Sequence, residues 1–570
     1  MGLFNSLQVA SGALNANSYG IQVVGQNLAN VDTPGYVREQ VLYSASGTLN
    51  KGNAAVGTGV QVNGVIQMID QYLEERLRSS MSDTMNSSTQ SKAYSDLEAL
   101  IGEFESNGIT TSMAEFFNLI GNVLNQPENL SYRQQVAGAG ESLAYQISTL
   151  SQQLLKIQVD LNRQVEDTAK TINRLTETIQ SLNVEIARIE AGKNGSTEAV
   201  GLRDQRIAAL AELSKIVNIR THEDAGTGIV SVFCGSTPLI VEGTRREVCV
   251  TYNNETDSDL SVAEIRITET KSKLDVTGGT LSGLYKSRDE ILGGFSRQLD
   301  EYANALINEF NKIFCSGQGL TGYDTLTSLE TVSDPNLPLN KSGLTYSPVN
   351  GAFNILVHNK ISDTTTTNRI DVPLDTTISG DGLTLQGLAD AINSVDGVTA
   401  RITTDNRLEI QVESEDVEFA FSDDTSGVLA ALGINVFFTG ADAKTIGINS
   451  LMLQDPGKFA ASSGGIGHDT GNAEFLASMP ETAVSKHNNL SVTQLYQNLV
   501  NGMTQKAGTV KSLAAADFSY YTTLEMQKQS ISGVDIDEET INLLSIQRTY
   551  QANARLVTVI NEMLESLLNM

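Results

Sequence analysis

The sequence predicts a mainly α-helical rod with a long helical bundle, paired N- and C-terminal coiled-coil helices and inserted β-rich domains. Three observations predict this fold. Apolar residues recur every seven positions at both ends of the 570-residue chain and again in its first third. Segments of alternating apolar and polar residues separate the helical stretches. Aromatic residues make up only 6% of the chain and Trp is absent, which suits helical rods and small β units.

The first helix is expected over residues 3–30. Its apolar residues form one row seven positions apart and a second row three positions further on, so one face of the helix needs a partner. The first row is Leu7, Leu14, Ile21 and Leu28, and the second is Ala10, Val24 and Val31. Pro34 and Gly35 end the helix, because the residue before a proline leaves the α region and glycine permits a turn.

The last helix is expected after a break at Ser532–Gly533, with Asp535 as its cap. Acidic residues 537–539 follow in the first turn, where negative charge suits the helix dipole. Breaks at Pro34 and Gly533 separate the two terminal helices from the rod, and a lone helix pair is marginal in water. We therefore predict packing that depends on assembly, through the first row above together with Leu543, Ile546, Tyr550, Asn553, Val557, Ile560, Leu564 and Leu567. Asn17 and Asn553 lie in apolar rows, where each can fix the register.

Between the ends, residues 34–65 are expected to be extended, and helices are expected at about 68–104, 112–126 and 201–217. A long helix is predicted by a row seven apart, Ile147, Leu154, Leu161, Thr168, Leu175, Leu182 and Ile189. Its flanking row changes sides near Gln164–Thr168, as happens where a seven-residue repeat drifts against the helical period. Gly192 and Gly195 are expected to end it. Bundle core is the favoured interpretation of this row.

The remaining segments predict β-rich insertions. Residues 226–276 are β-rich, and helices return at about 286–314 and 490–529. A short helix ending at Gly397 precedes alternating segments at 398–402, 408–412 and 417–421, which predict a three-strand meander with one buried face. The expected domains are a terminal coiled-coil domain (1–33 and 535–570), a helical rod domain (34–220, 277–324 and 481–534), a small β segment (221–276) and an inserted β-rich outer domain (325–480).

Composition and charge exclude several classes of function. The net charge of −29 argues against nucleic-acid binding. No cleavable signal peptide and no membrane-spanning stretch is expected. Cys234, Cys249 and Cys315 form neither a disulfide framework nor a metal pattern; buried thiols are favoured, and a bond between Cys234 and Cys249 is left open.

The residue types that carry chemistry are scattered. The four histidines, His222, His358, His468 and His487, belong to no metal-ligand pattern. The run 465–469 has no strand–helix frame for phosphate binding and predicts a loop. The acidic run 413–424 predicts a solvated strand face. We therefore expect no enzyme, catalytic residue, cofactor or metal.

Several segments carry a resemblance to a known family. Residues 27–36, Asn-Leu-Ala-Asn-Val-Asp-Thr-Pro-Gly-Tyr, resemble the N-terminal motif of flagellar axial proteins of the rod, hook and junction. Residues 550–555 resemble the last helix of that superfamily. Residues 202–206, 213–217, 278–284 and 288–290 are similar to the hook-associated protein 1 family, and 385–402 resembles a small module of hook and filament proteins.

The resemblance implies a structural subunit at the hook–filament junction. It implies export in an unfolded state by the flagellar type III apparatus, an extracellular place in the flagellum, and self-association in a layer. Hook protein and hook-associated protein 3 are the implied neighbours, and an export chaperone is implied on the helix around Leu543–Leu567. Two alternatives stay open: a hook or distal rod protein, and an adhesin or enzyme activity within residues 317–480. The long 143–189 helix and the 202–217 motif favour the junction class over the first.

Overall fold

A computed structural model describes residues 2–33, 35–51, 54–102, 108–190, 199–224, 226–254, 260–374, 382–467, 469–484 and 489–569. Pro34, Gly192, Gly195, His468 and His487, which carry expectations above, lie outside the described residues. The chain divides into two compact units. The first comprises Met1–Ala93, Val159–Asp289 and Gly508–Met570, and the second comprises Tyr94–Gln158 and Glu290–Ala507.

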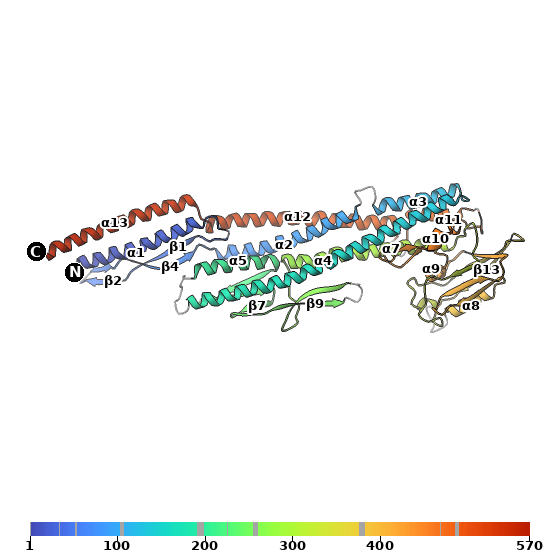
Figure 1. Cartoon of the computed structure of the whole chain (residues 1–570), viewed down its shortest axis with the longest axis horizontal. Helices are drawn as coiled ribbons and strands as arrows, with labels where there is room; N and C mark the ends of the chain where they lie inside the picture. Colours follow the sequence, from blue (N-terminus) through green and yellow to red (C-terminus); the bar gives the residue numbers. More distant parts are fainter. Residues whose placement is uncertain are drawn as a thin grey trace. The chain divides into compact units, whose positions relative to one another are not determined.

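Long helices dominate both units, and short antiparallel sheets are inserted between them, so the predicted mainly helical class is confirmed (Figure 1). The helices are α1 Gly2–Ala29, α2 Gln71–Ile101, α3 Ile109–Asn125, α4 Leu130–Glu190, α5 Val200–Ile216, α6 Gly279–Lys286, α7 Gly293–Cys315, α8 Leu385–Asn393, α9 Val428–Leu432, α10 Ser450–Gln454, α11 Gly471–Ser478, α12 Val492–Ser532 and α13 Ile536–Leu568. A π-helical segment, Ser287–Leu292, joins α6 to α7.

The first unit holds a two-stranded ribbon and two small sheets. In the ribbon, β1 (Glu39–Ala45) pairs with β4 (Val60–Gln67), and the outer strands β2 (Thr48–Lys51) and β3 (Ala54–Gly57) pair with each other. The predicted extended segment is therefore confirmed as a ribbon. Further along the chain lie a four-stranded sheet and a β9–β10 hairpin. Their strands are β5 Ile219–Glu223, β6 Val230–Cys234, β7 Thr237–Val241, β8 Thr244–Arg245, β9 Val248–Asn254 and β10 Ser261–Ile267.

Three asparagines on α4 hold these sheets against the helix. The side-chain amide of Asn183 donates to the carbonyl of Val230 (2.8 Å) and accepts from the same residue's N–H (3.1 Å). Asn173 makes the same pair of bonds with Val248 of β9 (2.8 and 2.9 Å). Asn162 bridges two residues of β10, the carbonyl of Ser261 and the N–H of Ala263 (2.8 and 3.1 Å).

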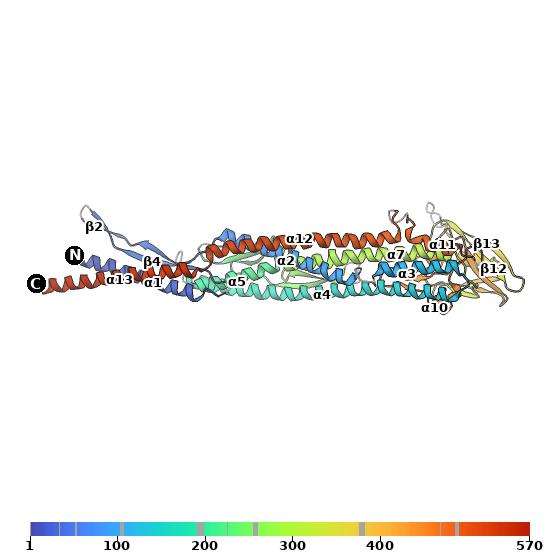
Figure 2. The same cartoon turned by 90° about the horizontal axis from the view of Figure 1, so that it is seen from above.

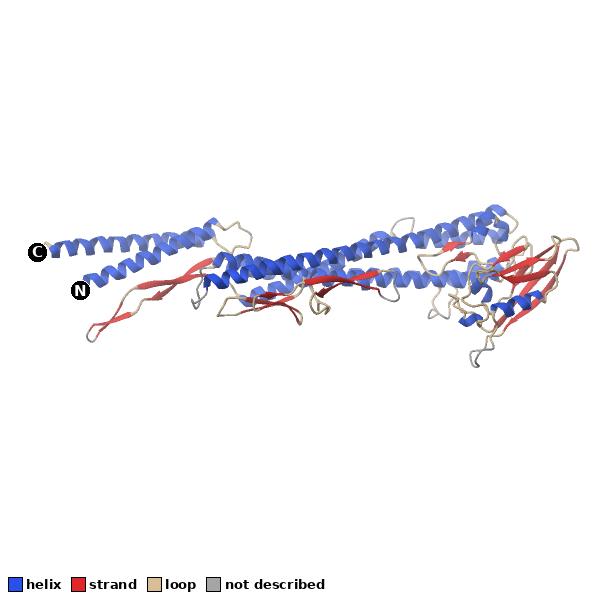
Figure 3. Ribbon diagram, turned by 60° about the horizontal axis from the view of Figure 1, so that its bottom comes forward, coloured by secondary structure: helices blue, strands red, loops and turns tan. Residues whose placement is uncertain are grey.

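These amides act as an additional strand partner. An amide carries one acceptor and a donor group in the same spacing as a peptide, so it satisfies both backbone groups of a strand that faces a helix. The three positions are 11 and 10 residues apart, close to three helical turns, so they share one face of α4. Figure 3 shows these sheets as short red arrows among the helices.

The predicted apolar row of α4 is largely buried. Leu154, Leu175 and Leu182 are buried, whereas Thr168 and Ile189 are half-buried. The change of side near 164–168 is confirmed. After the buried Leu161, the next buried apolar residues are Val165 and Ala169, each four positions after the one before it. The helix continues through this slip without interruption.

The core of the second unit contains a cluster of aromatic rings. Phe310 of α7 lies 5.4 Å from Phe116 of α3 and 5.1 to 5.3 Å from Phe437 and Phe438, measured between ring centroids. All four side chains are fully buried. Asn311, next in α7, accepts from the N–H of Phe438 and donates to its carbonyl, which is the same amide pairing that docks the strands on α4.

The outer part of the second unit contains two three-stranded sheets with the orders β11-β15-β14 and β13-β12-β16, and a short β17–β18 pair. The strands are β11 Thr325–Thr327, β12 Gly351–Asn359, β13 Thr364–Val372, β14 Val398–Ile402, β15 Leu408–Val412, β16 Val417–Ser422, β17 Phe438–Thr439 and β18 Gly447–Ile448. Helix α8 packs beside β14 and is capped by the Thr384 side chain, as the sequence predicts for a short helix there.

The predicted three-strand meander is wrong. β14 and β15 pair, but β16 leaves them and pairs with β12. The second edge of β15 is taken by β11 instead. β16 buries Phe419 and Phe421 on one face and Glu418 and Ala420 on the other, so its alternation does not mark a single buried face. Its carboxylate Glu418 accepts from the N–H of Gly322 (3.0 Å), and this one member of the acidic run is therefore not solvated as predicted.

The three cysteines are free thiols, which answers the question of a bond between Cys234 and Cys249. Cys234 and Cys315 are buried and Cys249 is half-buried, in agreement with the expectation of small packed side chains. Burial raises the pKa of the Cys234 thiol to about 12. Among the described residues, no helix is both long enough and apolar enough to span a membrane.

Candidate assembly site

Helices α1 and α13 pack side by side and antiparallel, as two views show (Figures 1 and 2). Asn27, near the end of α1, contacts Glu539 in the first turn of α13. Seven residues back along α1, Gly20 faces Ile546, seven residues on along α13. The β1–β4 ribbon covers a different side of α1, where Gly12 lies against the carbonyl of Val60.

The predicted interface residues lie in or beside this seam. Of the predicted set, Ile560 is buried, and most of the others are half-buried: Leu7, Leu14, Ile21, Leu28, Leu543, Ile546, Asn553, Val557 and Leu564. Tyr550 and Leu567 are exposed, Leu567 to 59%. Seven-residue spacing therefore places most of these side chains on the face that pairs within the chain, and their role between copies remains a prediction.

Small residues bury more deeply in α1 than the predicted leucines do. Ala10, Ala16, Gly20, Val23 and Val24 are buried, and only Ala10 and Val24 belong to the second predicted row. A Cβ on Gly20 would lie 2.8 Å from the Tyr43 hydroxyl and 3.1 Å from Ile546 Cδ1. The close approach of helix and ribbon therefore needs a glycine there. The signal that sequence reasoning missed is the run of small residues, which permits close packing on two sides.

A polar cluster joins the end of α1, the start of β1 and the start of α13. The Asn27 amide accepts from the N–H of Glu39 (3.0 Å) and from the Tyr36 hydroxyl (2.9 Å), and donates to the Glu39 carbonyl (2.9 Å). Its second donor reaches the Glu539 carboxylate at 3.1 Å. The motif at 27–36 thus folds back on itself through Asn27.

Arg38 completes this cluster. Its guanidinium lies 2.7 Å from the buried carboxylate of Glu539 and 3.1 Å from that of the exposed Glu538. Its backbone N–H donates to the carbonyl of Ser532 at the end of α12 (2.9 Å). Burial raises the pKa of the Tyr36 hydroxyl, and the nearby carboxylates Glu39, Asp204 and Glu539 raise it further. Asp535 caps α13 as predicted, accepting from the N–H groups of residues 537 and 538.

The surface of the terminal pair is unusual for a chain of such high charge. Helix α1 contains no charged side chain in its 28 residues. On α13, a second apolar row lies outside the seam and is open to solvent. Its members, exposed between 43 and 66%, are Ile541, Leu544, Leu556, Val559, Met563 and Leu567. Ile541 and Val559 are 18 residues apart, which is five whole helical turns, so they share one face.

Two buried polar atoms of α1 have no hydrogen-bond partner among the described residues, Asn5 Oδ1 and Asn17 Nδ2. Buried polar groups are normally paired, because an unpaired one loses its bonds to water without compensation. Asn553, predicted like Asn17 to fix the register, donates only to the carbonyl of Thr549 in its own helix. The two asparagines do not bond each other, so their expected role in register is not realised in the single chain.

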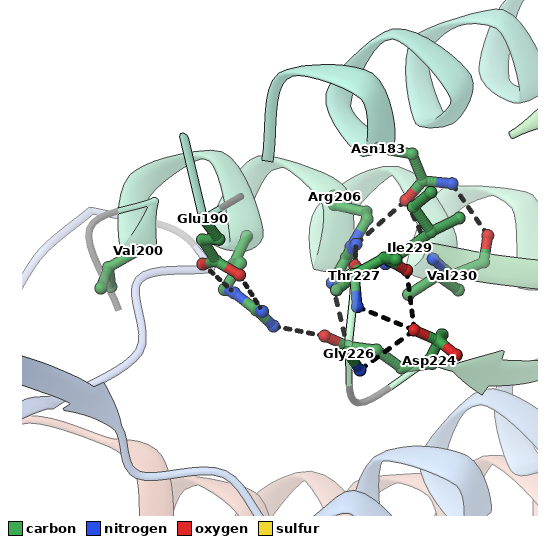
Figure 4. A network of polar contacts seen from close by, with 12 residues as sticks. Asn183, Glu190, Val200, Arg206, Asp224, Gly226, Thr227, Ile229 and Val230 are labelled. Carbon is green, nitrogen blue, oxygen red and sulfur yellow. Dashed lines mark hydrogen bonds and ion pairs between the residues drawn. The ribbon is translucent and has the colours of Figure 1, made fainter. Parts of the chain in front are cut away.

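A second polar cluster surrounds the 202–206 motif of α5 (Figure 4). Arg203 pairs with Glu190 at the end of α4 (2.8 Å) and with Glu223 of β5 (2.5 Å). Arg206 pairs with the same Glu223 (3.1 Å) and donates to the Asn183 amide (3.0 Å). The hydrogen bonds that the Arg203 guanidinium donates to Glu190 raise the pKa of Arg203, whereas burial lowers the pKa of Arg206.

The motif is therefore a structural joint. Arg206 holds the amide of Asn183 that docks β6, and Arg288 does the same for Asn162, which docks β10 (2.9 Å). Between the two arginines of the motif, Asp204 accepts from the Gln67 amide of the ribbon. Burial raises the pKa of Asp204 to about 7, and the Glu39 carboxylate adds to the shift.

A cleft of about 670 Å³ lies beside this joint, lined by residues of α2, α5 and β5. Its charged side chains neutralise each other: Arg203 and Arg206 pair with Glu223, and Arg78 lies 3.9 Å from Glu74. Within the described ranges, no group of three or more His, Cys, Asp or Glu side chains is placed to hold a metal ion. The arrangement holds segments of the chain together.

Comparisons with known proteins assign this architecture. Three family models match: the helical domain of flagellar hook-associated protein FlgK over residues 94–326, the flagellar basal body rod FlgEFG protein C-terminal region over 527–570, and the flagella basal body rod protein over 7–36. Together these ranges span just over half of the chain.

Curated relatives match at full length. Flagellar hook-associated protein 1 of Escherichia coli K12 is 25% identical over 98% of both chains. The proteins of the same name from Salmonella typhimurium LT2 and Bacillus subtilis 168 are 26% and 24% identical, over 98 to 99% of this chain and 98% of each relative.

A solved structure shares the fold. The flagellar hook junction protein FlgK of Burkholderia pseudomallei aligns with a TM-score of 0.50 at 17% identity, over 80% of this chain and all of that one. The family models follow the order of the motifs, with rod-type ends around a hook-associated helical domain. The chain therefore resembles the hook-associated protein 1 family of flagellar axial proteins along its full length.

Proposed function

We propose that this chain is the structural subunit that joins hook to filament, and that it enters the flagellum through its terminal helix pair. A member of this family associates with other flagellar proteins. The observation that carries the proposal is the incompleteness of the α1–α13 pair. Its seam is covered within the chain, but the second apolar row of α13 is not.

The chemistry of the pair supports burial against further protein. An uncharged helix such as α1 loses no ion solvation when neighbours enclose it, whereas burying charges is costly. A chain that encloses the pair would supply partners for the buried atoms of Asn5 and Asn17 that no described residue bonds. A helix with two apolar rows on separate faces fits a bundle of more than two helices.

Self-association in one layer, with hook protein on one side and hook-associated protein 3 on the other, is the arrangement we propose. Head-to-tail contacts that do not close on themselves build such helical layers. We further propose export in an unfolded state by the flagellar type III apparatus to an extracellular place in the flagellum. A chaperone covering Leu543–Leu567 in the cytoplasm would protect the apolar rows of α13 before export.

A hook or distal rod protein is the related alternative. The models for rod proteins match only the two ends of the chain, whereas the hook-associated model matches 94–326, which includes α3 to α7. The terminal helices are thus common to the superfamily, and the long helical domain with its docked sheets supports the junction role.

A point substitution tests the assembly surface without removing any element. Val559→Asp places a charge in the second row, and Thr558→Asp places the same charge on the adjacent exposed position outside that row. Both variants are expressed in a strain that lacks the protein. We expect normal filaments with Thr558→Asp, and hooks without filaments, with flagellin shed into the medium, for Val559→Asp. Filaments of normal length with Val559→Asp would contradict the proposed surface.

Deletion of residues 2–33 and 535–570 removes both terminal helices and tests whether assembly needs them at all. We expect the remaining chain to stay folded by circular dichroism and to fail to support filament growth. Filament growth supported by the shortened chain would rule out assembly through the terminal pair.

A further inference from the structure

The seam between α1 and α13 leaves the relative position of the two helices poorly determined. Apolar residues recur every seven positions on both helices, so a shift of α13 by seven residues, about 10 Å, again places apolar side chains opposite apolar side chains. Coiled coils resolve this ambiguity with a polar residue that finds its partner in only one register. Asn17 and Asn553 do not play this part in the single chain, since neither bonds across the seam.

Glu539 meets the requirement for such a residue. It is one of two buried residues of α13, and its side chain is only 3% exposed. Its carboxylate accepts from Asn27 Nδ2 at 3.1 Å and lies 2.7 to 2.9 Å from two nitrogens of Arg38. A buried carboxylate needs such partners, and removing them leaves a charge without water or counter-ion.

The partners of Glu539 are themselves fixed in place. The Asn27 side chain bonds both backbone groups of Glu39. The backbone N–H of Arg38 donates to the carbonyl of Ser532, and the carbonyl of Arg38 accepts from the N–H of Met68. These bonds tie the partners to the base of the ribbon and the end of α12, not to the seam itself. A shift of α13 therefore cannot carry the partners with it.

No other level of α1 offers a substitute. A shift by one heptad would bring Glu539 to the level of Gly20 or place it beyond the end of α1. Helix α1 has no cation at any position, and Gly20 already contacts Ile546 and the Tyr43 hydroxyl. Only the observed register pairs Glu539.

We propose that Glu539, bound by Asn27 and Arg38, is the residue that sets the register of α13 on α1. Because register determines which part of the second apolar row stands beside which part of α1, this contact positions the surface offered to a neighbouring copy. In that consequence the inference rests on the proposed function, but the register itself is a property of the isolated chain and is measured there.

A distance measurement between two nitroxide labels reports the register directly. Ser18 of α1 and Ser545 of α13 are both exposed and serve as labelling sites after replacement by cysteine. Cys249→Ser removes the one native thiol that is not buried. We expect the full-length chain to give one narrow distance distribution by pulsed electron paramagnetic resonance.

Three variants in this background separate register from charge. Glu538→Ala is the matched control, because Glu538 also pairs with Arg38 and stands one position away, but is 58% exposed. We expect Glu538→Ala to retain the narrow distribution and Glu539→Ala to add populations shifted by up to about 10 Å. Glu539→Gln, which keeps the size and an acceptor but not the charge, should give an intermediate width.

Equal distributions for Glu539→Ala and Glu538→Ala would overturn the inference. If Glu539→Ala loses helical circular dichroism, the comparison of Glu539→Gln with Glu538→Ala decides instead, and equal widths there overturn it. Val559→Asp in the labelled background should keep the wild-type distance while blocking filament growth. A failure of the register inference therefore appears in the distances, and a failure of the proposed function appears in the filaments.

Discussion

Helices α7 and α13 both carry apolar faces but have very different surroundings. More than half of the residues of α7 are buried, including the aromatic side chains that meet Phe116 and Phe438. In the 33 residues of α13 only Glu539 and Ile560 are buried. An apolar pattern predicts that one face of a helix is buried. This chain buries that face in α7 but leaves much of the apolar surface of α13 exposed to solvent.

The difference also holds for polar side chains. Asn183, Asn173 and Asn162 on α4 each pair with backbone groups of a strand. Asn17 on α1 has a buried Nδ2 that no described residue bonds. The strands docked on α4 find their partners within one chain, whereas we propose that neighbouring copies complete the terminal pair. Four substitutions can break or sharpen this contrast.

The largest effect is expected in the aromatic core. Phe310→Ala removes a fully buried ring with five aromatic neighbours and should lower the free energy of unfolding by about 3–5 kcal/mol. In the free chain, Ile560→Ala in α13 should lower the free energy of unfolding clearly less, because the two terminal helices can repack around the smaller side chain. Urea titration followed by circular dichroism measures both. Equal losses would show that the terminal pair is as well packed as the core.

A smaller loss is expected at the strand docking sites. Asn183→Leu keeps the size of the side chain but leaves both backbone groups of Val230 and a donor of Arg206 without this partner. We expect Asn183→Leu to lower the free energy of unfolding by about 2–3 kcal/mol, which is typical when buried polar groups lose their hydrogen-bond partners. Hydrogen exchange should accelerate in β6. The half-buried Asn553, whose amide bonds only its own helix, is changed to Leu in the same way as the control and should leave hydrogen exchange in β6 unaltered.

A pH dependence is expected at the ribbon. The pKa of Asp204 is about 7 in the folded chain, above the value near 4 of an unfolded aspartate. Between these values the folded state holds a proton that the unfolded state has lost, so the stability contributed here falls as pH rises from about 4 to 7. Asp204→Asn should abolish this fall. Thermal unfolding at pH 5 and pH 8 measures it, with Asp167→Asn on the exposed face of α4 as control.

The smallest effect is expected from Asn17→Leu. Removing a buried donor without a partner should leave the free chain unchanged or stabilise it by up to about 1 kcal/mol. The same variant should reduce filament growth if a neighbouring copy supplies the missing acceptor. A marked loss of stability in the free chain would mean that Asn17 is already satisfied there, and the contrast with Asn183 would fail.

Local elements followed closely from the sequence. The bounds of α1 and α13, the cap at Asp535 and the slip near residue 165 agree with the predicted pattern, whereas α4 begins at Leu130, before the predicted 143–189 stretch. These features depend on neighbours within a turn or two of the chain. Strand partners do not, and the error at β16 shows it: alternating residues predicted the strand, but its partner β12 lies about sixty residues earlier.

The sequence by itself determined that the chain is helical, acidic and interrupted by β modules, and that both ends carry apolar rows, because period and charge are local properties. Only the tertiary structure decided which polar residues join these parts. Glu539 lay in the acidic first turn and was predicted to serve the helix dipole, whereas it is buried against Asn27 and Arg38, some 500 residues earlier. The register that brings such distant side chains together results from the packing of the whole unit and leaves no periodic signal in the sequence.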